Sequence, residues 1–322
     1  MEENKVAKAL PVKHIGQVLA EAKFTIDEER SGKQLGLYSN WRRVNVSIGK
    51  YFRFGRVTYL AGMSGCGKST FLNKLHDDFT NPQINGGFHG QVIVLAFSYE
   101  MSGADEVLRN IATKMEVQYS NLISSAWDND FKTYKRLSDE DYLTAMSVMD
   151  SLKDRPIFYV ETAGNLEQLI ATRDMMGKRY PKAKFVITLD HTLLSTKLSE
   201  ASDLELQSNT AKVAATLKKH YNDHVILIGQ LNGEIEKTQR RETFALHTPI
   251  KTDIHNGNQI FWACDDVYII HRPELLHIKL YGTAKMPTKD LIHLIKIKGR
   301  FSDIGSIFMK GNWEKNTITE II

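Results

Sequence analysis

A short segment of the sequence combines glycines, a lysine and hydroxyl side chains at a spacing suited to phosphate binding. Residues 62–70 read GMSGCGKST, which fits the pattern G-x-x-x-x-G-K-[ST]. Glycines allow backbone N–H groups to turn toward a phosphate, Lys68 can neutralise the β- and γ-phosphates, and the Ser69 hydroxyl can ligate Mg²⁺. The residues expected to hold the phosphates are Gly62, Ser64, Gly65, Cys66, Gly67, Lys68, Ser69 and Thr70, with Cys66 contributing its backbone.

Three further polar residues end or follow apolar runs and suit phosphoryl transfer. Asp190 can hold the magnesium ion through water, or it caps the end of its strand. Glu100 can polarise the attacking water as a general base, or it complements the dipole of the next helix. Gln230 can hydrogen-bond a γ-phosphate and relay nucleotide state to the loop that follows, or it holds a neighbouring loop.

These residues need a scaffold that brings strand ends together, and the rest of the chain predicts one. Apolar strands alternate with amphipathic helices, which indicates an α/β fold with a mainly parallel sheet covered on both faces. Ligands of such sheets bind beyond the carboxyl ends of the strands. The expected parallel strands are 56–61, 91–98, 156–161, 184–189 and 224–229, and the expected antiparallel additions are 266–271, 275–281, 290–297 and 305–308.

The N-terminal segment is expected to form a separate arm. Residues 11–29 predict an amphipathic helix, which packs either on its own domain or on a neighbouring subunit. A Ser-Gly break follows, so we expect an arm over 1–34 and one large domain over 35–322.

The composition excludes several classes of protein. The 322 residues carry a net charge of +4 and only two cysteines, which predicts neither a disulfide framework nor a structural metal site. The apolar runs are strand-length, so no membrane span is expected. The N-terminus lacks the pattern of a secretory signal, so a cytoplasmic location is expected.

Together these motifs resemble the RecA-like motor domain of the DnaB family of replicative helicases, including its phage members. The resemblance runs from about residue 35 to the C-terminus, and it rests on residues 62–70, FSYEMS at 97–102, Asp190, GQLN at 229–232 and KIKGR at 296–300. It implies a P-loop ATPase that uses ATP and Mg²⁺, with Glu100 as the catalytic base and Arg109 near the nucleotide. It also implies that Lys298 and Arg300 reach the ATP of an adjacent subunit and stabilise charge in phosphoryl transfer. Alternatively, these two residues form a solvated strand edge.

The resemblance assigns DNA contacts to two loops. Residues 253–260 align with the family's channel loop, but His255 and Asn256 replace its usual basic and acidic pair. We expect DNA-binding residues at Lys197, His255, Asn256 and Asn258, which would bind phosphates without sequence preference. The aromatic pair at 261–262 either stacks on bases or belongs to the core.

The function implied is an ATP-dependent helicase of the 5′–3′ type, working on single-stranded DNA as a homo-oligomeric ring of six subunits. The alternative is a RecA-core ATPase that does not unwind DNA, either a recombinase-like filament or a nucleotide-switched scaffold. The family's N-terminal domain, which contacts primase, is not expected here because few residues precede the motor. We therefore expect a phage-type member with a linker helix alone, or a separate chain supplying that domain, and a primase or loader as partner.

Overall fold

The computed structural model describes residues 11–88, 91–99, 101–123, 137–162, 164–190, 203–255 and 258–321. The chain divides into two compact units, residues 1–35 and 36–322. Within the first unit, helix α1 (Ile15–Arg30) begins at His14, whose imidazole accepts a hydrogen bond from the Gly16 N–H. The Gln17 side chain in turn accepts one from the His14 N–H. This capping box explains why the helix begins four residues later than the sequence pattern predicts.

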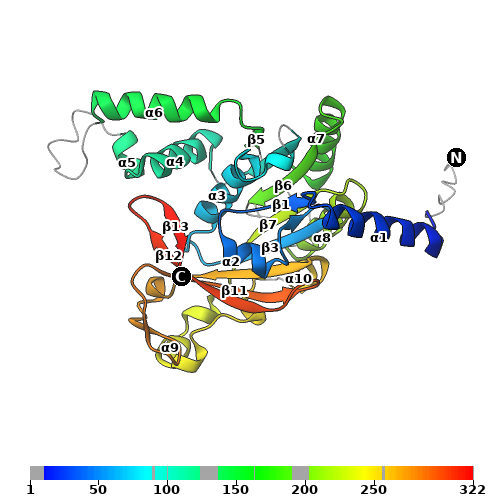
Figure 1. The fold of residues 1–322 in the computed structure, drawn as a ribbon. Helices are drawn as coiled ribbons and strands as arrows, with labels where there is room; N and C mark the ends of the chain where they lie inside the picture. Colours follow the sequence, from blue (N-terminus) through cyan, green and yellow to red (C-terminus); the bar gives the residue numbers. More distant parts are fainter. Residues whose placement is uncertain are drawn as a thin grey trace, which may run out of the picture. The chain divides into compact units, whose positions relative to one another are not determined.

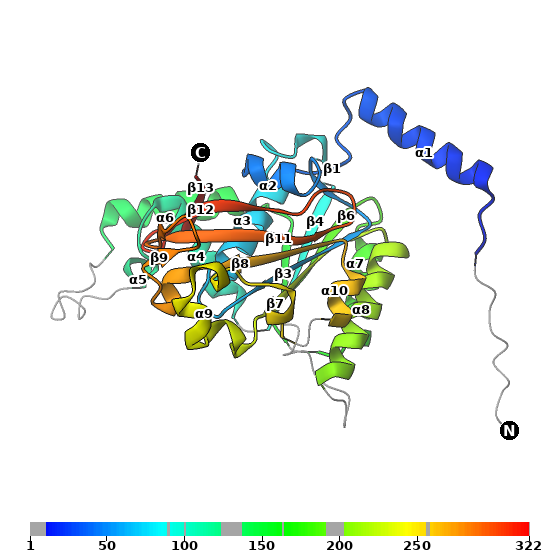
Figure 2. The same cartoon turned by 90° about the horizontal axis from the view of Figure 1, so that it is seen from below.

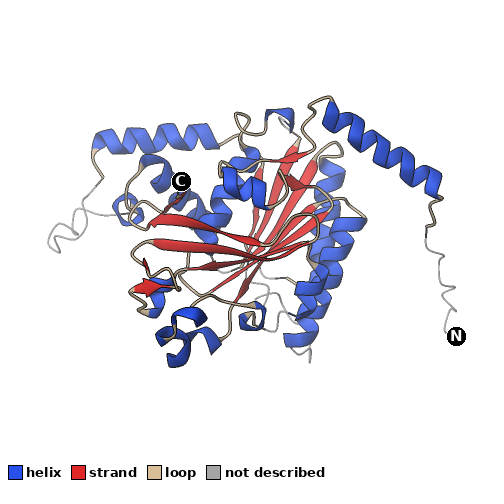
Figure 3. Ribbon diagram, turned by 60° about the horizontal axis from the view of Figure 1, so that its bottom comes forward, coloured by secondary structure: helices blue, strands red, loops and turns tan. Residues whose placement is uncertain are grey.

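The second unit is built on a large sheet. Its strands are β3 (Arg56–Gly62), β4 (Val92–Ser98), β5 (Ile157–Val160), β6 (Lys184–Asp190), β7 (His224–Gln230), β8 (Asp266–His271), β11 (Leu291–Gly299), β12 (Gly305–Asn312) and β13 (Thr317–Glu320). They lie in the order β13-β12-β11-β8-β3-β7-β6-β4-β5 (Figures 1 and 3). The six strands from β8 to β5 run parallel, whereas β11, β12 and β13 extend the sheet in antiparallel pairings. The predicted α/β fold with antiparallel C-terminal strands is confirmed.

The parallel strands are buried on both faces, which is why their sequences are almost continuously apolar. Along β4, residues 92, 94 and 96 join one core cluster and residues 93, 95 and 97 join the other. The first cluster packs beneath α2 (Arg42–Ser47) and α3 (Lys68–Thr80). The second packs beneath α7 (Leu166–Arg179), α8 (Asp203–Lys219) and α10 (Asn258–Ala263).

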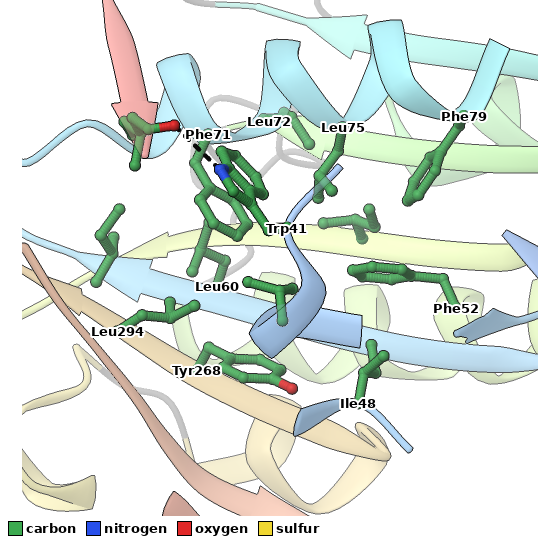
Figure 4. Close-up of a cluster of buried hydrophobic side chains, with 14 of the residues drawn as sticks. Trp41, Ile48, Phe52, Leu60, Phe71, Leu72, Leu75, Phe79, Tyr268 and Leu294 are labelled. Carbon is green, nitrogen blue, oxygen red and sulfur yellow. Dashed lines mark hydrogen bonds between the residues drawn. The ribbon is translucent and has the colours of Figure 1, made fainter. Parts of the chain in front are cut away.

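Aromatic residues join the first cluster to the P-loop helix (Figure 4). Trp41 stacks on Phe71 of α3 with 4.4 Å between ring centroids, and its indole N–H donates to the Ile318 carbonyl at 3.0 Å. These contacts link α3 to the C-terminal strand β13.

The remaining elements lie in the connections. Helices α4 (Gly103–Met115), α5 (Tyr119–Leu122) and α6 (Asp139–Leu152) follow β4, and α9 (Thr238–Glu242) lies between β7 and β8 (Figures 1 and 2). Two small antiparallel pairs, β1 (Gly36–Leu37) with β2 (Phe52–Arg53) and β9 (Leu280–Tyr281) with β10 (Met286–Pro287), complete the unit.

One predicted strand is wrong in part. Residues 275–281 were expected to extend the sheet, but Pro273–Leu276 forms a 3₁₀ turn and only Leu280–Tyr281 is a strand, outside the main sheet. Proline in the first turn and His277 at φ 58° end extended structure there. Across the described residues, no helix is both long and apolar enough to cross a membrane.

Candidate functional site

The glycine-rich loop lies between the end of β3 and the start of α3, as its sequence predicts. Gly65 and Gly67 adopt φ of 73° and 99°, a conformation that favours glycine. A Cβ on Gly62 would lie 2.6 Å from the Cys66 sulfur and 2.7 Å from the Ile270 carbonyl oxygen, so this position also has no room for a side chain. The loop therefore presents its backbone at the N-terminus of α3, the arrangement that binds phosphate.

Two side chains of the loop have different surroundings. Lys68 donates from Nζ to the carbonyls of Gly62 at 3.0 Å and Met63 at 2.7 Å, so its ammonium lies along the loop. Cys66 is buried in the core, and burial raises the pKa of its thiol. A neutral, buried thiol leaves only the Cys66 backbone for ligand binding.

A cavity of about 720 Å³ opens over this loop. It brings together the P-loop, Arg109 of α4 and Gln230 at the end of β7, which pairs in register with Gly62. Residues 118–120 and the turn between β12 and β13 complete the wall. The lining residues are Ser64, Gly65, Gly67, Lys68, Ser69, Thr70, Met101, Arg109, Gln118, Tyr119, Ser120, Ile228, Gly229, Gln230, Trp313, Glu314 and Asn316.

The wall formed by Trp313 was not predicted from the sequence. The Arg272 guanidinium carbon lies 3.7 Å from the Trp313 ring centroid, and Arg272 is itself paired with Glu274. A Cβ on Gly67 would approach the Trp313 ring to 3.2 Å, so the indole lies directly against the P-loop. A lone tryptophan near the C-terminus carries no motif, and only the folding of β12 beside β11 brings it here.

The two predicted carboxylates end neighbouring strands. β6 ends at Asp190, which pairs in register with Ser98, the last residue of β4. Glu100 follows two residues later and lies outside the described residues. Ser98 donates from Oγ to Glu106, so the end of β4 is tied to α4, the helix that carries Arg109.

The predicted cations Lys298 and Arg300 lie at the opposite edge of the sheet from the P-loop. β11 is antiparallel to β8, and its Gly299 pairs with Asp266 at the start of that strand. The Arg300 N–H donates to Asp265, whose N–H donates to Val57 at the start of β3. Since the P-loop begins at Gly62, five residues further along β3, the finger and the P-loop of one chain are separated by roughly 17 Å of strand.

Both cations have partners within their own chain. Lys298 donates from Nζ to the carbonyls of Phe261 at 2.6 Å and Trp262 at 3.3 Å, at the end of α10. Burial and the neighbouring Arg300 lower the pKa of Lys298. Arg300 pairs with the carboxylate of Asp265 at 3.0 Å.

The predicted DNA loop is joined by hydrogen bonds to the end of β7. The His255 N–H donates to the Gln230 carbonyl at 3.0 Å, and the Asn232 N–H donates to Asp253 at 2.7 Å. Asn258 begins α10, whereas Lys197 and Asn256 lie outside the described residues.

Two basic and aromatic residues of this region differ from expectation. Arg240 does not face solvent as a DNA contact: it forms a two-point ion pair with buried Asp253, at 2.9 Å for each contact. Phe261 is buried, as a core residue should be, but Trp262 is 66% exposed. Lys251 lies near both rings, 4.4 Å from the Phe261 centroid and 4.8 Å from that of Trp262.

Comparisons with known proteins agree with this architecture. The family model for the DnaB-like helicase C-terminal domain matches residues 36–318. The ATPase domain of a DnaB-like helicase superposes with a TM-score of 0.79 at 15% identity, covering 97% of this chain and 100% of that one. A DnaB-like replicative helicase, described with its interactions with primase, superposes with a TM-score of 0.76 at 15% identity, covering 97% of this chain and 68% of that one. No curated protein sequence matches this chain. Because the family model spans nearly all of the large unit, the chain belongs to the DnaB-like helicase C-terminal domain family.

Proposed function

We propose that this protein is an ATP-dependent replicative DNA helicase that translocates on single-stranded DNA as a ring and hydrolyses ATP between neighbouring subunits. Membership of the family implies an ATP-hydrolysing helicase in general. The observation that carries the finer proposal is the distance between two groups that phosphoryl transfer needs together. Lys298 and Arg300 lie at one edge of the sheet and the P-loop at the other.

The cavity over the P-loop is the proposed ATP site. Backbone N–H groups of the loop and Lys68 would hold the phosphates, and Arg109 and Gln230 would approach the nucleotide from the other walls. Trp313, backed by Arg272, offers a flat apolar surface for the base. Mg²⁺ would be held by the Ser69 hydroxyl and, through water, by Asp190, and it would neutralise charge on the phosphates.

Hydrolysis requires a base and a cation at the γ-phosphate. Glu100 follows β4 directly, beside the strand that ends at Asp190, so a carboxylate there suits activation of water. The cation is proposed to come from a second subunit, because the finger cannot bend back across its own sheet. Arg300 and Lys298 of one chain would then stabilise the transition state in the ATP site of the next.

DNA binding is proposed to communicate with this site through the end of β7. Gln230 lines the ATP cavity with its side chain, while its carbonyl accepts from His255 of the DNA loop. A shift of Gln230 on loss of the γ-phosphate would therefore move residues 253–258. The proposed DNA contacts are Lys197, His255, Asn256 and Asn258.

Assembly is proposed to use the arm over residues 1–34 as well as the motor over 35–322. The first unit contains one described helix, so the apolar residues of α1 have no second element of that unit to pack against. A neighbouring subunit of a hexamer would supply that surface. A primase or loader as partner, and action in the cytoplasm, belong to the same proposal.

Strand separation on forked duplexes tests the helicase activity. One fork carries a 5′ single-stranded tail and a matched fork carries a 3′ tail. We expect ATP-dependent unwinding of the 5′-tailed fork and little unwinding of the other. Unwinding of the 3′-tailed fork alone would overturn the polarity, and unwinding of neither would favour a RecA-core ATPase that does not separate strands.

A further inference from the structure

A single buried carboxylate, that of Asp265, connects the finger to the rest of the motor. Asp265 is fully buried in the segment between α10 and β8. Its Oδ2 accepts from the Val57 N–H at 2.9 Å, and its backbone N–H donates to the Val57 carbonyl at 2.8 Å. Asp265 is therefore fixed to the start of β3, the strand that leads to the P-loop.

The same residue fixes Arg300 by backbone and side chain. The Asp265 carbonyl accepts from the Arg300 N–H at 2.9 Å, and its Oδ1 pairs with the guanidinium at 3.0 Å. These two contacts determine where the chain leaves β11 and in which direction the Arg300 side chain departs.

A second cation makes Arg300 dispensable for neutralising this carboxylate. Lys218 of α8 donates from Nζ to both oxygens of Asp265, at 2.6 and 2.7 Å, and its side chain is only 15% exposed. One carboxylate faces two cations, so Lys218 alone balances the buried charge if Arg300 moves away. The usual penalty of leaving a buried charge unpaired would not oppose that movement.

A contrasting pair within the molecule shows how an arginine is held permanently. Arg173 binds Asp223 through both Nε and NH2, at 2.7 and 2.9 Å, and its side chain is 9% exposed. Arg300 touches its aspartate through one nitrogen and is 44% exposed. The first pair is closed from solvent, whereas the second leaves the guanidinium able to reach outward.

We propose that Asp265 is the positioning residue of the finger: it aims Arg300 toward the neighbouring ATP site and releases it at low cost, because Lys218 keeps the carboxylate neutralised. This inference rests on the proposed function, since it requires Arg300 to act in trans. Preorganisation of this kind raises the rate of the chemical step without adding affinity for the nucleotide.

The test compares Asp265→Asn, Arg300→Ala and the double variant. Measurements are the kcat of DNA-stimulated ATP hydrolysis with radiolabelled ATP, the affinity for a fluorescent ATP derivative, and the mass of the assembled protein. We expect Asp265→Asn to lower kcat about 10- to 100-fold, as displacement of a catalytic group does, with nucleotide affinity and assembly retained. The double variant should be no slower than Arg300→Ala alone, because Asp265 acts through that residue.

Asp223→Asn is the matched control, since it removes an equally buried carboxylate from a cation pair that does not involve the finger. It should lower the melting temperature but leave the kcat of assembled protein at the wild-type value. If Asp265→Asn does not fold, Asp265→Glu keeps the charge while displacing it, and should give an intermediate kcat.

The outcomes separate the two proposals. Wild-type turnover by Arg300→Ala would overturn the trans finger itself. Impaired Arg300→Ala beside an unimpaired Asp265 variant would overturn only the positioning role. A double variant slower than Arg300→Ala would also overturn it, because Asp265 would then act through Lys218 or β3.

Discussion

At Gly67 both the backbone conformation and the surrounding space exclude a side chain. Its φ is 99°, and an added Cβ would meet the Trp313 ring at 3.2 Å. The strain of placing alanine here is about 1–3 kcal/mol, which the loop can relieve only by changing the shape of its phosphate cradle. Gly67→Ala should therefore abolish nucleotide binding while most of the fold persists.

Binding of a fluorescent nucleotide and a thermal melt check this expectation. Gly86→Ala is the control, because an added Cβ there meets nothing within 4 Å and the residue does not have the φ that favours glycine. Tight nucleotide binding by Gly67→Ala would mean that the phosphates lie elsewhere.

Trp313 gives a second prediction at the residue scale. If its indole forms the base wall of the ATP site, Trp313→Ala should raise the KM for ATP roughly 10-fold, given that stacking on a base contributes about 1–3 kcal/mol. The kcat should change less, because the base is distant from the reacting phosphate.

Phe244→Ala is the control, since Phe244 also faces a cation, Lys285 at 5.6 Å, but does not line the cavity. An unchanged KM in Trp313→Ala would remove the indole from the nucleotide site. Steady-state kinetics over a range of ATP concentrations distinguish the two results.

At the scale of elements, helix α3 carries a buried histidine that makes its packing depend on pH. His76 is 2% exposed and its Nε2 lies 3.1 Å from the Thr188 hydroxyl of β6. Burial lowers the pKa of His76 to about 3. Between about pH 6.5 and 3 the unfolded chain therefore binds a proton that the folded chain excludes, so this group makes the free energy of unfolding fall as pH falls.

His76→Gln should make the acid loss shallower by up to about 1.4 kcal/mol per pH unit, because glutamine keeps a polar group near Thr188 but does not titrate. Urea unfolding at pH 7 and pH 5 measures the difference. Exposed His220 is the control site, and His220→Gln should retain the wild-type dependence. A His76→Gln protein with the wild-type dependence would show that His76 is not held neutral.

The sequence allowed prediction of those elements whose signal is local. The P-loop and the parallel strands have dense apolar runs with glycine-rich or polar ends, and the structure contains them within a few residues of the expected bounds. Helix α6 and strand β13 were not predicted, because α6 buries only Ala145 and β13 is short. Their patterns carry too little periodicity to read.

The parts of the site that could not be predicted depend on tertiary placement. Trp313 and Arg272 are 41 residues apart in sequence and meet only because β8 and β12 lie on either side of β11. Arg240 belongs to a basic run that suggested DNA contact, and only the fold pairs it with Asp253. The position of the finger at the edge opposite the P-loop likewise required the register of β11 on β8.

At the scale of the whole molecule, catalysis in trans makes each subunit depend on its neighbour. Arg300→Ala should bind nucleotide normally yet lose DNA-stimulated hydrolysis, since a finger contributes about 10³–10⁵ in rate. Mixed into wild-type protein before assembly, it should reduce turnover by more than its share of subunits.

Gly86→Ala subunits mixed in the same proportion provide the control, because they alter neither the ATP cavity nor the finger. A strictly proportional decrease with Arg300→Ala would indicate that subunits hydrolyse ATP independently. Measurement of turnover against the mixing ratio gives the answer.

The most direct test of a DNA motor that works as a ring is the rate of ATP hydrolysis with and without single-stranded DNA, taken on a sample whose mass is measured with ATP and Mg²⁺ present. We predict a mass of six subunits and hydrolysis that single-stranded DNA stimulates. A protein that remains monomeric with nucleotide, or whose turnover ignores DNA, would contradict the account.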